Sequence, residues 1–161
     1  MKIFPLLTLI ADDSDDNRVL FARAVRSVPG LSVAALTTDG VDTLAYMNGC
    51  VPYNNRVKFP YPDLILLDYQ MPGYNGLEVL MSLRGLTPHP KVILWSDAID
   101  AIDAILAYQM GADFVCSKPI LSQEIETVLK RVQPWAFNSG ISGLSFASTS
   151  YSRLECFELR S

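Results

Sequence analysis

Four short sites, widely separated in the sequence, carry the side chains that could do chemistry. They are an acidic pair, a lone acid closing an apolar run, a hydroxyl after another such run, and a lysine before a proline: Asp12 and Asp13, Asp68, Ser96, and Lys118. Each site follows a segment that is typical of a buried strand. If those strands lie side by side and parallel, all four sites meet at one edge of a sheet, in a pocket that suits a divalent cation and a phosphoryl group.

The chemistry of such a pocket follows from its charges. Carboxylates within roughly 4–5 Å of one another repel by about 4 kcal/mol per pair at an effective dielectric of about 20, so three of them need a cation. Oxygen ligands favour Mg²⁺ or Mn²⁺ over zinc. Asp68 could then attack a phosphoryl group, with Lys118 and the metal balancing charge and Ser96 donating a hydrogen bond. The only histidine, His89, lies between two prolines and is expected to be an exposed loop residue.

The segments that would position these residues alternate between strand-like and helix-like patterns. The predicted strands cover 6–11, 31–36, 64–67, 92–95 and 114–116, and the predicted helices cover 15–28, 41–47, 75–84, 100–110 and 122–132, with Pro134 ending the last one. Five β-then-α units predict an α/β fold, a doubly wound five-stranded parallel sheet with helices on both faces.

Length and composition limit the alternatives. A chain of 161 residues suits one domain with one sizeable core. The net charge of -4 and the lack of a basic run argue against direct DNA binding. The three cysteines form no CxxC pattern and favour a cytoplasmic protein. No apolar run approaches the length that crosses a bilayer, so we expect no membrane association.

Two regions do not follow the alternating pattern. Residues 49–62 hold three prolines and no helical period, which predicts a long surface loop. Residues 134–161 are rich in serine and glycine but also contain apolar residues such as Phe146 and Phe157. This second region is expected to be either a flexible tail or a docked extra hairpin, and the sequence does not decide between them.

Taken together, the motifs resemble the receiver domain of two-component response regulators. The matching stretches are Ala-Asp-Asp at 11–13, Leu-Leu-Asp-Tyr-Gln-Met-Pro-Gly-Tyr-Asn-Gly at 66–76, Ile-Leu-Trp-Ser at 93–96 and Gly-Ala-Asp-Phe-Val-Cys-Ser-Lys-Pro at 111–119. The resemblance covers about residues 5–132 and places a receiver domain at 1–133. It implies a flavodoxin-like fold with strand order 2-1-3-4-5.

The resemblance also implies a function and a role for each site residue. The protein would accept a phosphoryl group from a sensor histidine kinase or a phosphotransfer protein. The implied roles are phosphoacceptor for Asp68, direct Mg²⁺ ligands for Asp13, Asp68 and the backbone carbonyl of Gln70, a water-mediated ligand for Asp12, the switch hydroxyl for Ser96 and the ion-pairing lysine for Lys118.

The expected output is a protein–protein contact. Too little chain follows residue 132 for a helix-turn-helix or an enzymatic output domain, so we expect a single-domain regulator that is a switch and not a turnover enzyme. It would catalyse only its own phosphorylation and dephosphorylation. The apolar helix 100–110 is expected either to serve the core or, with 122–132, to form the surface for an output protein or a homodimer.

Two alternatives stay open. A pseudo-receiver, acting as an interaction module without phosphate, is favoured by two departures from the family pattern. Asp97 stands where a small residue usually follows the switch hydroxyl, and Val115 stands where an aromatic residue is usual, with Phe114 one position earlier. A small phosphohydrolase would need a second acid just after the nucleophile, and Tyr69 and Gln70 offer none.

Overall fold

The structure, a computed structural model, describes residues 4–118 and 122–138. The strands of this part of the chain are β1 (Leu6–Ala11), β2 (Leu31–Thr37), β3 (Leu64–Asp68), β4 (Lys91–Ser96) and β5 (Phe114–Ser117). The helices are α1 (Asp15–Ser27), α2 (Gly40–Asn48), α3 (Gly76–Leu83), α4 (Ala101–Gln109) and α5 (Ser122–Asn138). All neighbouring strands pair in parallel, in the order β2-β1-β3-β4-β5. The predicted doubly wound sheet and its strand order are confirmed.

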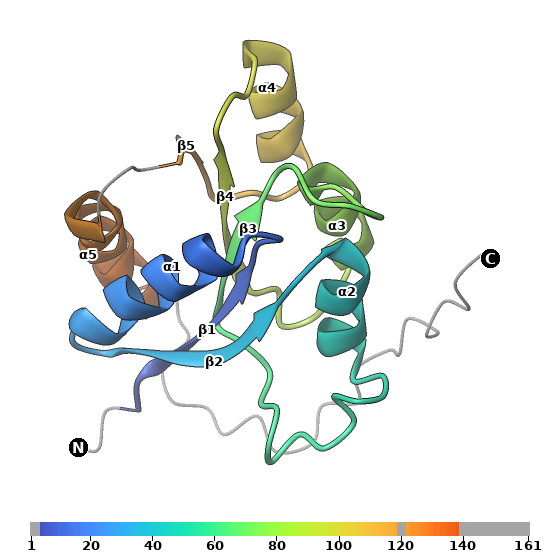
Figure 1. Cartoon of the computed structure of the whole chain (residues 1–161), viewed down its shortest axis with the longest axis vertical. Helices are drawn as coiled ribbons and strands as arrows, with labels where there is room; N and C mark the ends of the chain where they lie inside the picture. The colour runs from blue at the N-terminus through green and yellow to red at the C-terminus, as the bar shows by residue number, and fades with distance from the viewer. Residues whose placement is uncertain (1–3, 119–121, 139–161) are drawn as a thin grey trace.

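Helices cover both faces of the sheet (Figure 1). α1 and α5 lie on one face, where Phe21 packs against Trp95 at 5.4 Å between ring centroids. α2, α3 and α4 lie on the other face, around Leu67 and Leu94. β3 is buried along its whole length because it lies at the centre of the sheet and has a helical layer on each side.

Polar side chains set where the helices begin. Ser14 caps α1, Asp39 caps α2 and Asp100 caps α4, each by accepting a hydrogen bond from a backbone amide of the first turn. The predicted capping box at the start of α3 is present, with Asn75 and Glu78 bonding each other's backbone amides. These caps fix the direction in which the chain leaves each strand, and so fix the loops at the carboxyl edge of the sheet.

The end of α5 differs from the prediction. The helix does not stop at Pro134 but continues to Asn138. Proline removes one backbone hydrogen bond, but its fixed φ is compatible with a helix, so a proline weakens a helix without always ending it. The tail from residue 139 onward lies outside the described residues, and its two predicted forms stay untested.

The loop between α2 and β3 is closely packed against the protein. Its tyrosine and phenylalanine rings, Tyr53 and Phe59, meet at 5.1 Å and both contact Tyr46 of α2. The guanidinium of Arg56 lies 5.6 Å from the centroid of the Tyr46 ring and donates to the carbonyl of Met47 at 2.8 Å. The long loop predicted at 49–62 is therefore confirmed as a loop, with a small aromatic cluster of its own.

None of the helices in the described ranges combines the length and the apolar character that a bilayer-spanning helix requires.

Candidate functional site

The four sites of the sequence come together at the carboxyl edge of the sheet. Ala11, the last residue of β1, pairs with Leu67 of β3, so Asp12 and Asp68 follow at the same level. Asp68 pairs with Trp95, which precedes Ser96. Because β5 pairs with β4 through Ser96 and Ser117, the next residue, Lys118, reaches the same edge.

Three carboxylates form a cluster at this edge. One oxygen each from Asp12, Asp13 and Asp68 lies within 4.8 Å of the others. Asp12 and Asp68 are buried, at 1% and 2% exposed, while Asp13 is exposed. Two of the acids are therefore buried and the third faces solvent, on the side from which a hydrated cation could approach. Mg²⁺ and Mn²⁺ fit this set because every side-chain donor is a hard oxygen.

Lys118 supplies positive charge to the two buried acids. Its Nζ lies 2.9 Å from Oδ2 of Asp12 and 3.0 Å from Oδ2 of Asp68. Burial alone would lower the pKa of Lys118, but the contacts with Asp12 and then Asp68 outweigh burial, and the pKa lies above its ordinary value. The lysine is therefore an ammonium that bridges two carboxylates, and it leaves the cluster with a surplus of negative charge.

Asp68 is the residue that the surplus charge affects. Burial, and after it the negative charge of Asp12, raise the pKa of Asp68 to about 6 from 3.8, although Lys118 and the amide of Gln70 lower it in part. That amide donates to Oδ1 of Asp68 at 3.1 Å. The carboxylate form of Asp68 would therefore be favoured by additional positive charge, which a cation beside it would provide.

Asp12 is held by residues that the sequence motifs did not place in the site. Its Oδ1 accepts from the backbone amide of Ser14 at 2.9 Å and from the side-chain amide of Asn17 at 3.3 Å. The guanidinium of Arg18 donates to the backbone carbonyl of Asp12 at 2.6 Å. All three donors come from the cap and first turn of α1, so a search for donors in the turn after the acidic pair could have found them.

Ser96 is buried at the same edge but does not bond to Asp68. Its hydroxyl donates to the carbonyl of Ala98 at 2.8 Å, and the amide of Ala98 lies 3.2 Å from the same hydroxyl oxygen. The serine therefore fixes the start of the loop that leads to α4. Asp97, the first unusual residue, is exposed, and Val115, the second, is half-buried and packs on the α2–α3–α4 side of the sheet.

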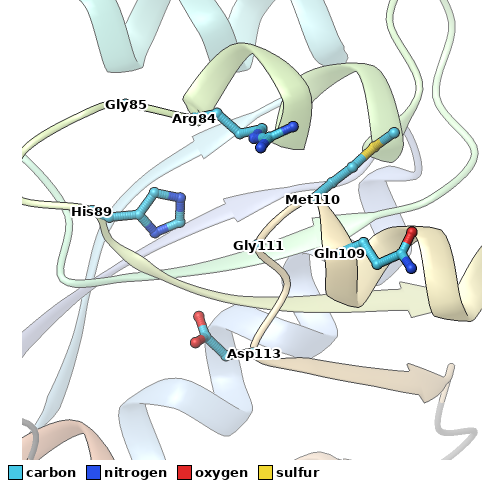
Figure 2. A pocket seen from close by; sticks show the side chains of 7 residues that line it. All are labelled: Arg84, Gly85, His89, Gln109, Met110, Gly111 and Asp113. Atoms are coloured by element: carbon cyan, nitrogen blue, oxygen red, sulfur yellow. The ribbon is translucent and has the colours of Figure 1, made fainter.

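A hollow lies at the end of the sheet opposite to the acidic edge. Figure 2 shows that Arg84, His89 and Asp113 line it, at the end of the sheet where β4 and β5 begin; its volume is about 350 Å³. Arg84 and Asp113 bring opposite charges to it, so its electrostatics favour neither an anion nor a cation. His89, expected to be exposed, is half-buried here, and it takes no part in the acidic cluster.

The fold and the cluster of acids define a class of doubly wound α/β domains with an acidic carboxyl edge, and comparison with known proteins gives the family. The model of the response regulator receiver domain matches residues 8–130. The chain therefore belongs to the family of response regulator receiver domains, as the motifs predicted.

The named relatives have different functions by their names. Protein-glutamate methylesterase/protein-glutamine glutaminase 5 of Myxococcus xanthus is 32% identical over 118 residues, which are 73% of this chain and 31% of that protein. The phosphate regulon transcriptional regulatory protein PhoB of Escherichia coli is 31% identical over 105 residues, 60% of this chain and 46% of that protein. This chain thus spans about a third to a half of the length of these relatives, which include an enzyme and a transcriptional regulator.

Solved structures agree on the fold. The signal receiver domain of the putative response regulator NarL from Mycobacterium tuberculosis is 26% identical and covers 84% of this chain and 98% of its own, with a TM-score of 0.67. The Mn²⁺-bound form of the response regulator Rcp1 is 20% identical and covers 84% and 96%, with a TM-score of 0.69.

Proposed function

We propose that this receiver accepts a phosphoryl group on Asp68 from a sensor histidine kinase or a phosphotransfer protein, in the presence of Mg²⁺ or Mn²⁺. One observation carries the proposal: oxygens of Asp12, Asp13 and Asp68 lie within 4.8 Å of one another. Lys118 forms ion pairs with two of these acids. A partly buried cluster with three acids around one lysine is costly for a fold to keep unless a ligand uses it.

The transfer is a substitution at phosphorus. A carboxylate oxygen of Asp68 forms the new P–O bond, the P–N bond of the donor's phosphohistidine breaks, and the donor imidazole keeps the electron pair and takes a proton. Lys118 already lies 3.0 Å from Asp68 and can neutralise charge on the phosphoryl oxygens. Ser96, by turning from Ala98, can donate to one of them.

The metal would be held by the exposed side of the cluster. Asp13, Asp68 and the backbone carbonyl of Gln70 are the proposed direct ligands, and Asp12 is the proposed partner through water. When bound, the ion supplies positive charge to the transferring oxygens. Asp12 suits an indirect role because its Oδ1 already accepts from both Ser14 and Asn17, whereas, within the described residues, Oδ1 of Asp68 accepts from the amide of Gln70 alone.

We further propose that residues 1–133 form the receiver unit and that the protein acts in the cytoplasm. In this proposal the receiver is a switch without turnover chemistry. Its output is a protein contact and not direct binding to DNA. α4 supports a contact surface because three of its large apolar side chains are exposed, namely Ile102 (70%), Ile105 (57%) and Tyr108 (51%). With α5 it offers a face for an output protein or a second copy of the chain.

Phosphate-affinity electrophoresis tests the proposal directly. Incubation with acetyl phosphate and Mg²⁺ should give a retarded band that is absent with EDTA and absent in Asp68→Asn. Asp63→Asn is a matched control, because Asp63 is another partly buried acid, at the opposite end of β3, and its variant should still be labelled. An unlabelled wild type, or a band that survives Asp68→Asn, would contradict the proposal.

The second candidate is a pseudo-receiver that binds its partner without phosphate. The hydroxyl of Ser96 favours it, because both its donor and its acceptor are used by Ala98. A partner that binds wild type and Asp68→Asn with equal affinity, before and after treatment with acetyl phosphate, would establish this candidate instead.

A further inference from the structure

The residue after the phosphoacceptor bonds to a different element of the protein. The hydroxyl of Tyr69 donates to Oδ2 of Asp103, which lies in the first turn of α4. No sequence pattern indicates this contact, because the two residues are 34 positions apart. It joins the loop that follows Asp68 to the helix whose apolar surface is exposed.

The backbone of Tyr69 is held at both of its polar groups. Its amide donates to the carbonyl of Trp95 at 2.8 Å, and its carbonyl accepts from the amide of Gly76 at 2.8 Å. Gly76 is required at that approach, because a Cβ there would lie 2.8 Å from the carbonyl oxygen of Asp68. Tyr69 is therefore a rigid attachment point, and its side chain carries that rigidity to α4.

α4 is more weakly held than the other helices that flank the sheet. Ala107 is its only buried residue, whereas α3 buries Val79, Leu80 and Leu83. A helix with so little buried apolar surface depends on a few polar contacts for its position. The Tyr69–Asp103 bond is one of them, and it is charge-assisted, which makes it stronger than a bond between neutral groups.

Acidic residues around the Tyr69–Asp103 bond indicate how phosphorylation of Asp68 would affect it. The segment from β4 into α4 carries Asp97, Asp100 and Asp103. The hydroxyl of Tyr69 contacts Asp103, and Asp100, the N-cap of α4, accepts from the amide of Asp103 at 2.8 Å, so both acids belong to the turn that the bond holds. A phosphoryl group on the adjacent Asp68 would add negative charge near carboxylates that the bond holds in place.

We propose that Tyr69 is a positioning residue that holds the first turn of α4, through Asp103, in the arrangement of the unphosphorylated protein. The inference rests on the proposed function, in which Asp68 is phosphorylated. Loss of the bond shifts α4 toward its arrangement in the phosphorylated protein. Because the coupling between two sites is reciprocal, loss of the bond should also strengthen the binding of a phosphoryl mimic.

The test uses the full chain and four variants. Tyr69→Phe and Asp103→Ala remove the bond, Asp103→Asn keeps an acceptor at the same place, and Tyr61→Phe is the matched control. Tyr61→Phe removes a tyrosine hydroxyl that donates to Pro88, a residue outside α4. Two quantities are measured: hydrogen exchange of α4 amides without ligand, and the affinity for beryllofluoride with Mg²⁺ by isothermal titration.

The expected result separates the bond from general stability. Tyr69→Phe and Asp103→Ala should exchange α4 amides about fivefold to tenfold faster and bind beryllofluoride tighter by a similar factor, as suits a partly exposed hydrogen bond to a charged group. Asp103→Asn should be nearer to wild type in exchange rate and in affinity. Tyr61→Phe should equal wild type in both measurements.

Two kinds of failure are distinguishable. A wild type that binds beryllofluoride and accepts phosphate, with Tyr69→Phe equal to it or weaker in affinity, would overturn this inference alone. A wild type that neither binds beryllofluoride nor is labelled by acetyl phosphate would overturn the proposed function and, with it, this inference.

Discussion

Two regions of the protein gather polar and charged groups, and they use them in opposite ways. In the loop between α2 and β3, Arg56 donates to a backbone carbonyl and lies against an aromatic ring, and Tyr53 donates to Asp42 at 2.6 Å. At the carboxyl edge of the sheet, by contrast, one lysine serves two buried acids and a third acid lies beside them. In the loop, the polar groups are paired within the protein and stabilise its structure. At the carboxyl edge, the acids carry more negative charge than Lys118 neutralises, and this surplus indicates a place for a ligand.

The largest expected effect comes from removing the one positive charge inside the cluster. Lys118→Met should destabilise the metal-free protein by about 3 to 5 kcal/mol, because two buried carboxylates lose their shared partner. Urea unfolding at pH 7.5 measures it. Asp12→Asn in the Lys118→Met background should recover part of the loss; no recovery would mean that the cost is not charge repulsion.

The next largest effect is a gain in stability from replacing a buried residue, Asp68, where such a substitution usually lowers stability. Asp68→Asn should stabilise the metal-free protein at pH 7.5 by about 1 to 3 kcal/mol, since the pKa of Asp68 rises to about 6 on folding and a tenfold change in proton affinity corresponds to about 1.4 kcal/mol. The folded state binds this proton more tightly than the unfolded state does. The penalty in wild type is therefore full above the folded pKa, shrinks as the pH falls through 6, and is absent below the unfolded value of 3.8.

Unfolding curves of wild type and Asp68→Asn between pH 7.5 and 4.5 measure this difference. The gap in free energy between the two proteins should narrow steadily as the pH falls. A gap that is constant over this range, or a variant that is less stable than wild type at pH 7.5, would show that Asp68 carries no penalty.

Metal binding should act on the acidic edge and leave the loop unaffected. Mg²⁺ at ten times its dissociation constant should stabilise wild type by about 1.4 kcal/mol. Calorimetry should show a higher Tm with Mg²⁺ in wild type and none of that increase in Asp13→Asn. An equal increase in Asp13→Asn would remove Asp13 from the proposed ligands.

The smallest effect belongs to the loop. Tyr53→Phe removes the hydroxyl that donates to Asp42 and should cost about 1 kcal/mol, as a partly exposed hydrogen bond does. Its Tm should fall equally with and without Mg²⁺, and its labelling by acetyl phosphate should equal that of wild type. A changed response to Mg²⁺ in this variant would mean that the two regions are coupled.

Much of the site could be predicted because strand ends can be located from local patterns. Apolar runs that stop at Asp12, Asp68 and Ser96 mark the carboxyl ends of strands, and parallel strands bring such ends to one edge. The end of α5 was predicted wrongly, because a proline disfavours a helix locally without always ending it, and α5 continues through Pro134. The hydrogen bond from the side chain of Asn17 to Asp12 was not predicted, because an asparagine in the first turn of a helix can equally bond to the backbone or to water.

The order of polar and apolar residues by itself determined the five β-then-α units, the parallel sheet and the set of acids at its edge, since burial of alternating runs leaves few other arrangements. Only the tertiary structure decided which charges touch. The shared contact of Lys118 with two acids, the turn of Ser96 toward Ala98 and the bond from Tyr69 to Asp103 all join residues through space, and their energies depend on distance, burial and angle, which a linear pattern does not contain.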